Sequence, residues 1–174
     1  MSRHPVDGVY SFVERAYVRM QAGDLLIRCL EDVSIKPIQQ LVESLVLGGS
    51  SNIYILREIL REAGRRKLQV EEDLCHLYNG CENTLKSYGV RLPDKLENLV
   101  KTKFPQSVLL DILRQQGIRD QVSQEACLQI LKETRDIMES LSVRLELLAE
   151  IERYLEDWVW GVACLSNQHK SNLH

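Results

Sequence analysis

The sequence predicts an all-α protein, an antiparallel helical bundle with two long amphipathic helices and several short helices. Proline and glycine are sparse, at 4 and 9 of 174 residues, and only 6% of the residues are aromatic, which favours helices over strands. Residues 52–88 place apolar or small side chains at alternating steps of three and four, as one face of a long helix requires. Residues 123–164 form a second amphipathic stretch of similar length, which is expected to pack antiparallel to the first.

The composition predicts a globular protein of one helical domain or two small ones, with 44% apolar and 27% charged residues. No apolar run approaches the ~18 residues of a membrane span, and the first residues lack the apolar core of a signal peptide. Five cysteines at scattered spacings do not predict a disulfide framework. We therefore expect a cytoplasmic or nuclear protein without a membrane span, metal or cofactor. The formal charge of −3 argues weakly against nucleic acid as a partner.

Residues 1–51 are predicted to form short helices that precede a long-helix bundle at 52–165, with one continuous domain at 9–165 as the alternative. The first run, 9–20, is apolar on one side, and Gly23 and Asp24 are predicted to interrupt it before helical spacing resumes at 25–33. Pro37 then favours a helix start, and the glycine pair after Leu47 ends that helix. The apolar side of the first run comprises Val9, Phe12, Val13, Ala16, Tyr17 and Met20.

The long helix at 52–88 has Ser50, Ser51 or Asn52 as candidate caps. Its apolar stripe consists of Ile53, Leu56, Leu60, Ala63, Val70, Leu74, Leu77, Cys81, Thr84 and Tyr88, with Lys67 as the only charged member. Gly64 and Gly80 are its weak points, because glycine is a poor helix former. The stripe resumes in phase at Val70, which favours a continuous helix over one that ends between Gly64 and Lys67.

The second half of the chain contains two predicted short helices and the second long one. Pro93 separates the first long helix from a short helix at 94–103, and Gly117 closes another at 108–116. Ser123 is the expected cap of the last helix, and residues 166–174 are expected to be a disordered tail. The apolar set of the last helix comprises Cys127, Leu131, Met138, Leu141, Leu145, Leu148, Leu155, Val159 and Val162, flanked by Ile130, Ile137, Ile151 and Trp158.

Charge patterning predicts contacts between the two long helices. The basic stretch 57–67 can oppose the acidic residues of 146–157, while the acidic stretch 71–73 can meet Lys132, Arg135 or Arg144. Both pairings are satisfied by an antiparallel register. Exposed pairs contribute only ~0–1 kcal/mol each, so they are expected to select orientation while apolar burial supplies stability. The same basic stretch is also a candidate binding site, and the sequence leaves these two roles open.

Residues 25–35 resemble the second helix of the death-effector domain, a six-helix member of the death-fold superfamily. Further matches to its fourth and fifth helices are Leu41, Leu45, Gly49, Leu56, Glu58, Ile59, Leu60, Arg65 and Leu68. The family's Arg-x-Asp-Leu motif corresponds to residues 65–68, where Lys67 replaces the aspartate. The resemblance covers roughly residues 9–77. It implies an adaptor or decoy in apoptotic or innate immune signalling that assembles through homotypic contacts of 25–29 and 65–68.

No catalytic signature is present, so we predict a non-enzymatic adaptor that binds a helical protein or a second copy of itself. Cys75, His76 and Cys81 lack the spacing of a metal site, and the two cysteines are expected to be buried. One of the two tryptophans is expected in the core and the other at an interface.

The alternative function is a nucleic-acid-associated factor that uses the 57–67 face. The candidate partner-binding residues are Leu25, Ile27, Arg57, Arg61, Arg65, Arg66, Lys67, Leu68, Trp158 and Trp160.

Overall fold

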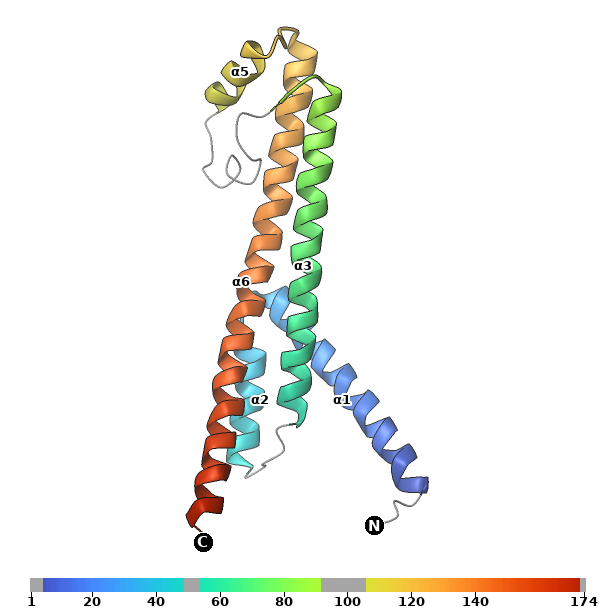
Figure 1. Ribbon diagram of the computed structural model, residues 1–174, viewed down its shortest axis with the longest axis vertical. Coiled ribbons are helices and arrows are strands. Elements are labelled where there is room, and N and C mark those ends of the chain that lie inside the picture. Colours follow the sequence, from blue (N-terminus) through green and yellow to red (C-terminus); the bar gives the residue numbers. More distant parts are fainter. Residues whose placement is uncertain (1–4, 49–53, 92–105, 173–174) are drawn as a thin grey trace. The chain divides into compact units, whose positions relative to one another are not determined.

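The computed structural model describes residues 5–48, 54–91 and 106–172, and their side chains within 12–48, 54–91 and 106–159 (Figure 1). The described residues form helices and connecting turns without a strand, so the all-α prediction is confirmed. The helices are α1 (Pro5–Asp32), α2 (Lys36–Leu47), α3 (Tyr54–Ser87), α5 (Gln106–Gln115) and α6 (Gln121–Asn172). The predicted caps at 50–52 and the predicted helix at 94–103 lie outside the described residues.

Helix α1 differs from its prediction because it continues through Gly23 and Asp24 without a break. A glycine inside a helix costs only ~1 kcal/mol relative to alanine. Ala22 and Leu26, on either side of these two residues, are fully buried. Burial of this apolar side outweighs the weak local preference against helix.

Helix α3 is continuous through Gly64 and Gly80, as the in-phase apolar stripe predicts. A Cβ atom added at either glycine would meet nothing within 4 Å. Both positions are therefore ordinary helical sites with room for an alanine side chain. The alternative, a helix that ends between Gly64 and Lys67, is not seen, and the resemblance to the death-effector domain stays a prediction.

Gly80→Ala is expected to raise the free energy of unfolding by about 0.5–1 kcal/mol, because alanine loses less backbone entropy in a helix. Urea denaturation followed by circular dichroism measures this change. Gly89→Ala is the matched control. Gly89 has a φ of +80°, and alanine is strained there despite the open space around it. The two substitutions should therefore shift stability in opposite directions.

The contacts divide the chain into two compact units, Met1–Leu68 with Arg144–His174, and Gln69–Val143. The predicted domain boundaries at residues 51 and 165 stay predictions. Helix α6 continues to Asn172, past the start of the predicted disordered tail.

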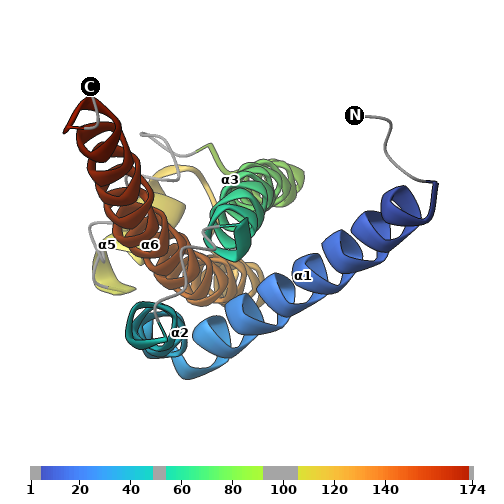
Figure 2. The same cartoon turned by 90° about the horizontal axis from the view of Figure 1, so that it is seen from below.

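The first unit contains α1, α2, the beginning of α3 and the later part of α6. Its buried apolar residues are Ala22, Leu26, Cys29, Ile38, Val42, Leu56, Ile59, Ala63, Leu147, Leu148, Ile151 and Leu155. At the α1–α2 junction the Ser34 amide donates to the Cys29 carbonyl at 3.0 Å, and Val33 adopts a φ of +49°. Figures 1 and 2 show α1 diverging from α2 towards its N-terminal end.

In the second unit, the end of α3 is closed by a Schellman motif. The Val90 amide donates to the Leu85 carbonyl at 3.0 Å, and the Gly89 amide donates to the Lys86 carbonyl at 2.9 Å. Gly89 supplies the positive φ that this motif requires. The motif folds Val90 back onto Leu85, and both side chains are 1% exposed.

Helix α5 ends in the same way. The Ile118 amide donates to the Leu113 carbonyl and the Gly117 amide to the Arg114 carbonyl, both at 3.1 Å, with φ +86° at Gly117. The glycine stop predicted from the sequence is therefore confirmed. The apolar pairs from both helix ends join one core cluster, which comprises Cys81, Leu85, Val90, Leu113, Ile118, Cys127, Leu131 and Met138.

Helix α6 begins two residues before the predicted Ser123 cap, and its cap is Asp120. The Asp120 carboxylate accepts a 2.9 Å hydrogen bond from the Ser123 amide, so Ser123 occupies the third helical position. Asp120 and Ser123 are both residue types that cap the N-terminus of a helix. Aspartate is favoured because its negative charge also suits the positive end of the helix dipole.

Stability at low pH should depend on Asp120. Hydrogen bonds from Ser123 hold the pKa of Asp120 below its ordinary value of 3.8. A lowered carboxyl pKa stabilises the fold above the unfolded-state value, and this contribution is lost as the pH falls through the folded-state pKa. The difference in Tm between the wild type and Asp120→Ala should therefore shrink when the pH is lowered from about 6 to about 3. Asp120→Asn is the control, because asparagine caps without titrating.

Candidate functional site

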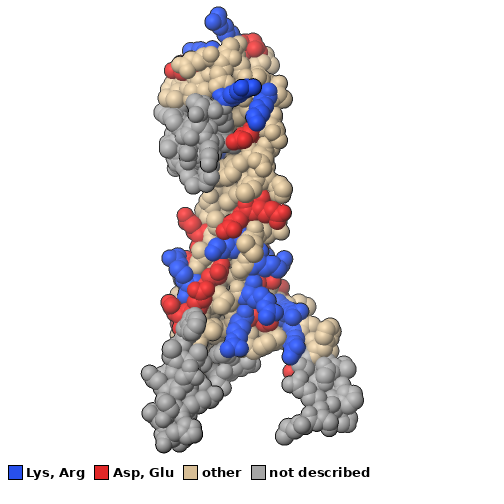
Figure 3. Space-filling model, viewed as in Figure 1, with Lys and Arg blue, Asp and Glu red and all other residues tan. Residues whose placement is uncertain are grey.

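Three arginines form a row on the solvent side of α3, one helical turn apart. Arg57, Arg61 and Arg65 follow each other at steps of four, opposite the buried stripe that contains Ile59 and Ala63. All three side chains are exposed. Figure 3 shows Lys and Arg side chains gathered over this part of α3. We call Arg57, Arg61 and Arg65 the arginine row.

A buried carboxylate connects the arginine row to α1. Glu58 is only 6% exposed. One of its oxygens lies 3.7 Å from Arg19 Nε of α1, and the other lies 3.6 Å from Arg61 Nη1. Both arginine side chains remain mostly exposed. Glu58 therefore places the guanidinium of Arg19 beside the arginine row.

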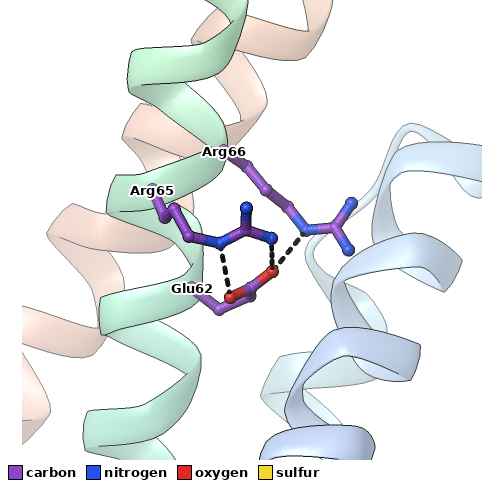
Figure 4. Close-up of polar contacts among 3 residues, drawn as sticks. All are labelled: Glu62, Arg65 and Arg66. Carbon is purple, nitrogen blue, oxygen red and sulfur yellow. Dashed lines mark hydrogen bonds and ion pairs between the residues drawn. The ribbon is translucent and has the colours of Figure 1, made fainter.

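Glu62 holds two further guanidinium groups (Figure 4). It accepts hydrogen bonds from Arg65 Nε at 3.0 Å, Arg65 Nη2 at 2.5 Å and Arg66 Nε at 3.1 Å. The bond from Arg65 is the main reason that the pKa of Glu62 lies below its ordinary value, and the same bond raises the pKa of Arg65. All of these pairs are local to α3.

Lys67 differs from these arginines because it points towards α6. Its Nζ lies 3.6 Å from Glu152 Oε1, a buried oxygen without a hydrogen-bond donor. Lys67 and α6 line a shallow groove whose α6 residues are Glu146, Ala149, Glu150, Glu152, Arg153 and Glu156. The predicted pairing between α3 and α6 is therefore confirmed at Lys67.

The other predicted pairings between the long helices are not seen among the described side chains. Arg61, Arg65 and Arg66 pair with glutamates of α3 itself. In the acidic stretch, Asp73 accepts a hydrogen bond from Gln69, and Glu72 faces His76 at 3.6 Å. Arg135 pairs with Glu139 one turn along α6. Residues three or four apart on one helix are already neighbours, so these pairs form without any contact between helices.

The basic region carries a surplus of positive charge. Four guanidinium groups, those of Arg19, Arg61, Arg65 and Arg66, pair with only two carboxylates, Glu58 and Glu62, and Arg57 adds a fifth positive charge to the arginine row. Three positive charges are therefore left over. Among the described side chains Arg57 has no ion pair. Uncompensated guanidinium groups are available to an acidic partner.

Helix α1 presents an apolar side to solvent, and most of its residues are absent from the partner-binding residues predicted from the sequence. Phe12 is 74% exposed, Tyr17 58% and Met20 63%. Val13, Ala16 and Ile27 lie on the same side and are also exposed. Their spacing follows the helical period, and all of them except Ile27 belong to the apolar run predicted at 9–20. We call Phe12, Val13, Ala16, Tyr17, Met20 and Ile27 the α1 apolar face.

The remaining candidates divide between core and surface. Leu25 is half-buried, while Ile27 and Leu68 are exposed. Trp158 is half-buried, and the side chain of Trp160 lies outside the described residues. The predicted roles of the two tryptophans therefore stay predictions.

The cysteines with described side chains divide between core and surface. Cys29, Cys81 and Cys127 are buried, and burial raises the pKa of each thiol. Cys75 is exposed, so the prediction that it is buried is wrong. It lies on the outer side of α3, between the buried positions Val70 and Cys81. No group of metal-ligating side chains occurs in the part of the chain with described side chains.

Within the described helices, none combines the length and apolar character that crossing a bilayer requires.

No protein-family model matches this sequence, and neither the curated proteins nor the solved structures contain a significant match to it.

Proposed function

We propose that this protein is a non-enzymatic helical adaptor that binds a helical protein partner. The α1 apolar face is the observation that carries this proposal. Four large side chains, Phe12, Val13, Tyr17 and Met20, are each at least 58% exposed within nine residues of one helix. A contiguous exposed apolar stripe is typical of a surface that another chain covers.

We further propose that α3 and α6 pack in opposite directions and form the rigid part of the adaptor. Lys67 pairs with Glu152 in the first unit, and Cys81 shares the core cluster of the second unit with Leu131 and Met138. These contacts support an antiparallel pair, because the contacting residue numbers fall along α6 as they rise along α3. Such a framework would hold the α1 apolar face in place for a partner.

The mass of the native particle tests the adaptor proposal. The protein, purified from its own cells under mild conditions, should give a light-scattering mass above that of one chain, and mass spectrometry should identify a helical protein in the complex. The Tyr17→Asp substitution should return the particle to the mass of one chain. A monomer with no companion, whose properties do not change with this substitution, would contradict the proposal.

The surplus of three positive charges favours a second candidate function, a nucleic-acid-associated factor. In that case phosphate contacts by the arginine row would supply the affinity, which would fall steeply with added salt. Charge reversal at Arg61 and Arg65 would abolish binding to DNA or RNA. A salt-insensitive complex with a helical protein would support the adaptor instead.

The death-effector resemblance sharpens the adaptor proposal. An adaptor or decoy of this kind would assemble through homotypic helical contacts in apoptotic or innate immune signalling. Of the two segments that the resemblance assigns to the contact, 25–29 exposes Ile27, and 65–68 exposes Arg65 and Leu68. Binding to an isolated death-effector domain that is lost with Leu68→Asp would support this version.

A further inference from the structure

We propose that the α1 apolar face and the arginine row together form one docking surface for an acidic amphipathic helix of another protein. This inference rests on the proposed adaptor function and names the chemistry of its partner. The ion pair between Arg19 and Glu58 joins the two parts of the surface. Figure 3 shows basic side chains over the first part of α3, in the same unit as α1.

The geometry of α1 suits a helix as the occupant. From Phe12 to Ile27 the apolar face extends about 22 Å at 1.5 Å per residue. From Phe12 to Met20 its members recur at steps of three and four, and Ile27 follows two turns later. This is the spacing that a second helix fills with its own apolar stripe. On the opposite side of α1, Ala22, Leu26 and Cys29 are buried in the unit's own core. The exposed stripe is therefore additional to the contacts that fold the unit.

The positive charge beside the α1 apolar face predicts acidic residues beside the apolar stripe of the partner helix. Arg19 lies at the edge of the apolar face, seven residues after Phe12, and the arginine row lies beyond it on α3. Among the described side chains, the five guanidinium groups of this region outnumber the two carboxylates that pair with them by three. Glutamates or aspartates along one edge of a docked helix would balance these charges, and rim charges of this kind raise association rates.

Two other occupants fit the surface less well. In a symmetric dimer the same patch meets itself, so two positively charged regions would be brought together. In a bilayer, Asp24 would be buried with the apolar face, because it follows Tyr17 and Met20 on the same side of α1 and is exposed. A protein helix can place a polar or basic group opposite Asp24.

Selection from a displayed peptide library tests the proposal with the full-length protein as bait. The library contains amphipathic helices of about four heptads with a fixed apolar stripe and either Glu or Lys at each flanking position. We expect selected peptides to carry glutamates along at least one flank. Their affinity should fall when salt is raised from about 0.05 M to about 0.2 M.

Variants locate the contact on the protein. Tyr17→Ala with Met20→Ala should weaken binding about tenfold or more, because truncation of buried aromatic and Met side chains removes hot-spot contacts. Arg57→Glu should weaken it mainly through slower association. Ile137→Ala and Arg119→Glu are the matched controls, since each changes an exposed residue of the same kind in the other unit. Both controls should bind normally.

The possible failures are distinguishable. Selected helices with neutral or basic flanks, or helices whose binding ignores the Tyr17 and Met20 substitutions, would overturn this inference and leave the adaptor proposal standing. Failure of every helix to bind would contradict both. Binding of phosphatidylserine vesicles, or of a second copy of the protein, that is lost with the same double variant would assign the surface to that occupant instead.

Discussion

Leu85→Ala is expected to lower the free energy of unfolding by about 2–5 kcal/mol, one of the two largest effects that we predict. Large-to-small substitutions in a packed core lose the transfer free energy of the removed atoms and leave a cavity. Leu85 is 1% exposed and belongs to the core cluster of the second unit. It is also the residue onto which the Schellman motif folds Val90, so the truncation removes support from the helix end as well.

Urea denaturation followed by circular dichroism measures this loss. Hydrogen exchange should show that protection falls first in 81–90 and 127–138, the segments that share the cluster. Leu68→Ala is the matched control, because Leu68 lies on the same helix and is 67% exposed. Its effect should remain within about 0.5 kcal/mol. Equal stability of the two variants would show that the cluster is not the core of this unit.

The same residue shows where sequence periodicity stops being informative. The predicted stripe of α3 ends with Thr84 and Tyr88, both of which are exposed, whereas the buried residue is Leu85. Steps of three and four identify a helix and its average face, but burial also depends on the residues beyond the end of the helix. Here Gly89 reverses the chain and places Val90 over Leu85. The sequence contains Gly89, but which residue of α3 is buried by the reversed chain depends on the fold.

The ion pairs between the two long helices were the feature that the sequence predicted least well. Opposite charges on the two long helices predicted several contacts, and only Lys67 makes one among the described side chains. Lys67 lies within the apolar stripe, so its side chain reaches the neighbouring helix. The arginines lie on other sides of α3, where Glu58 and Glu62 are nearer. Between α3 and α6, the contact is therefore made by the charge within the stripe, while Arg61, Arg65 and Arg66 pair with glutamates of α3.

The α1 apolar face was visible in the sequence as a periodic run, but its exposure was not. Apolar residues at helical spacing usually mark a buried side. Helix α1 has two apolar sides: Ala22, Leu26 and Cys29 enter the core, and the face with Tyr17 and Met20 remains exposed. Periodicity identifies both sides. Only the packing of the unit decides which of them is covered.

Gly64→Pro is expected to lower the free energy of unfolding by about 3 kcal/mol or more. Residue 64 lies ten residues after Tyr54, where α3 begins, and far before Ser87, where it ends. Proline there removes the amide that donates to the Leu60 carbonyl and places its ring against that carbonyl. The loss comes from the backbone alone, since nothing lies within 4 Å of a Cβ atom at this position.

Gly64→Ala is the control for this prediction, and it should raise stability by about 0.5–1 kcal/mol. Opposite signs for proline and alanine at one position are the expected signature of a helix interior. If the helix ended between Gly64 and Lys67, as in the death-effector pattern, proline at Gly64 would still remove a hydrogen bond of the last turn, but a terminal glycine with a positive φ would make Gly64→Ala destabilising. A loss of stability for Gly64→Ala would therefore contradict a continuous α3.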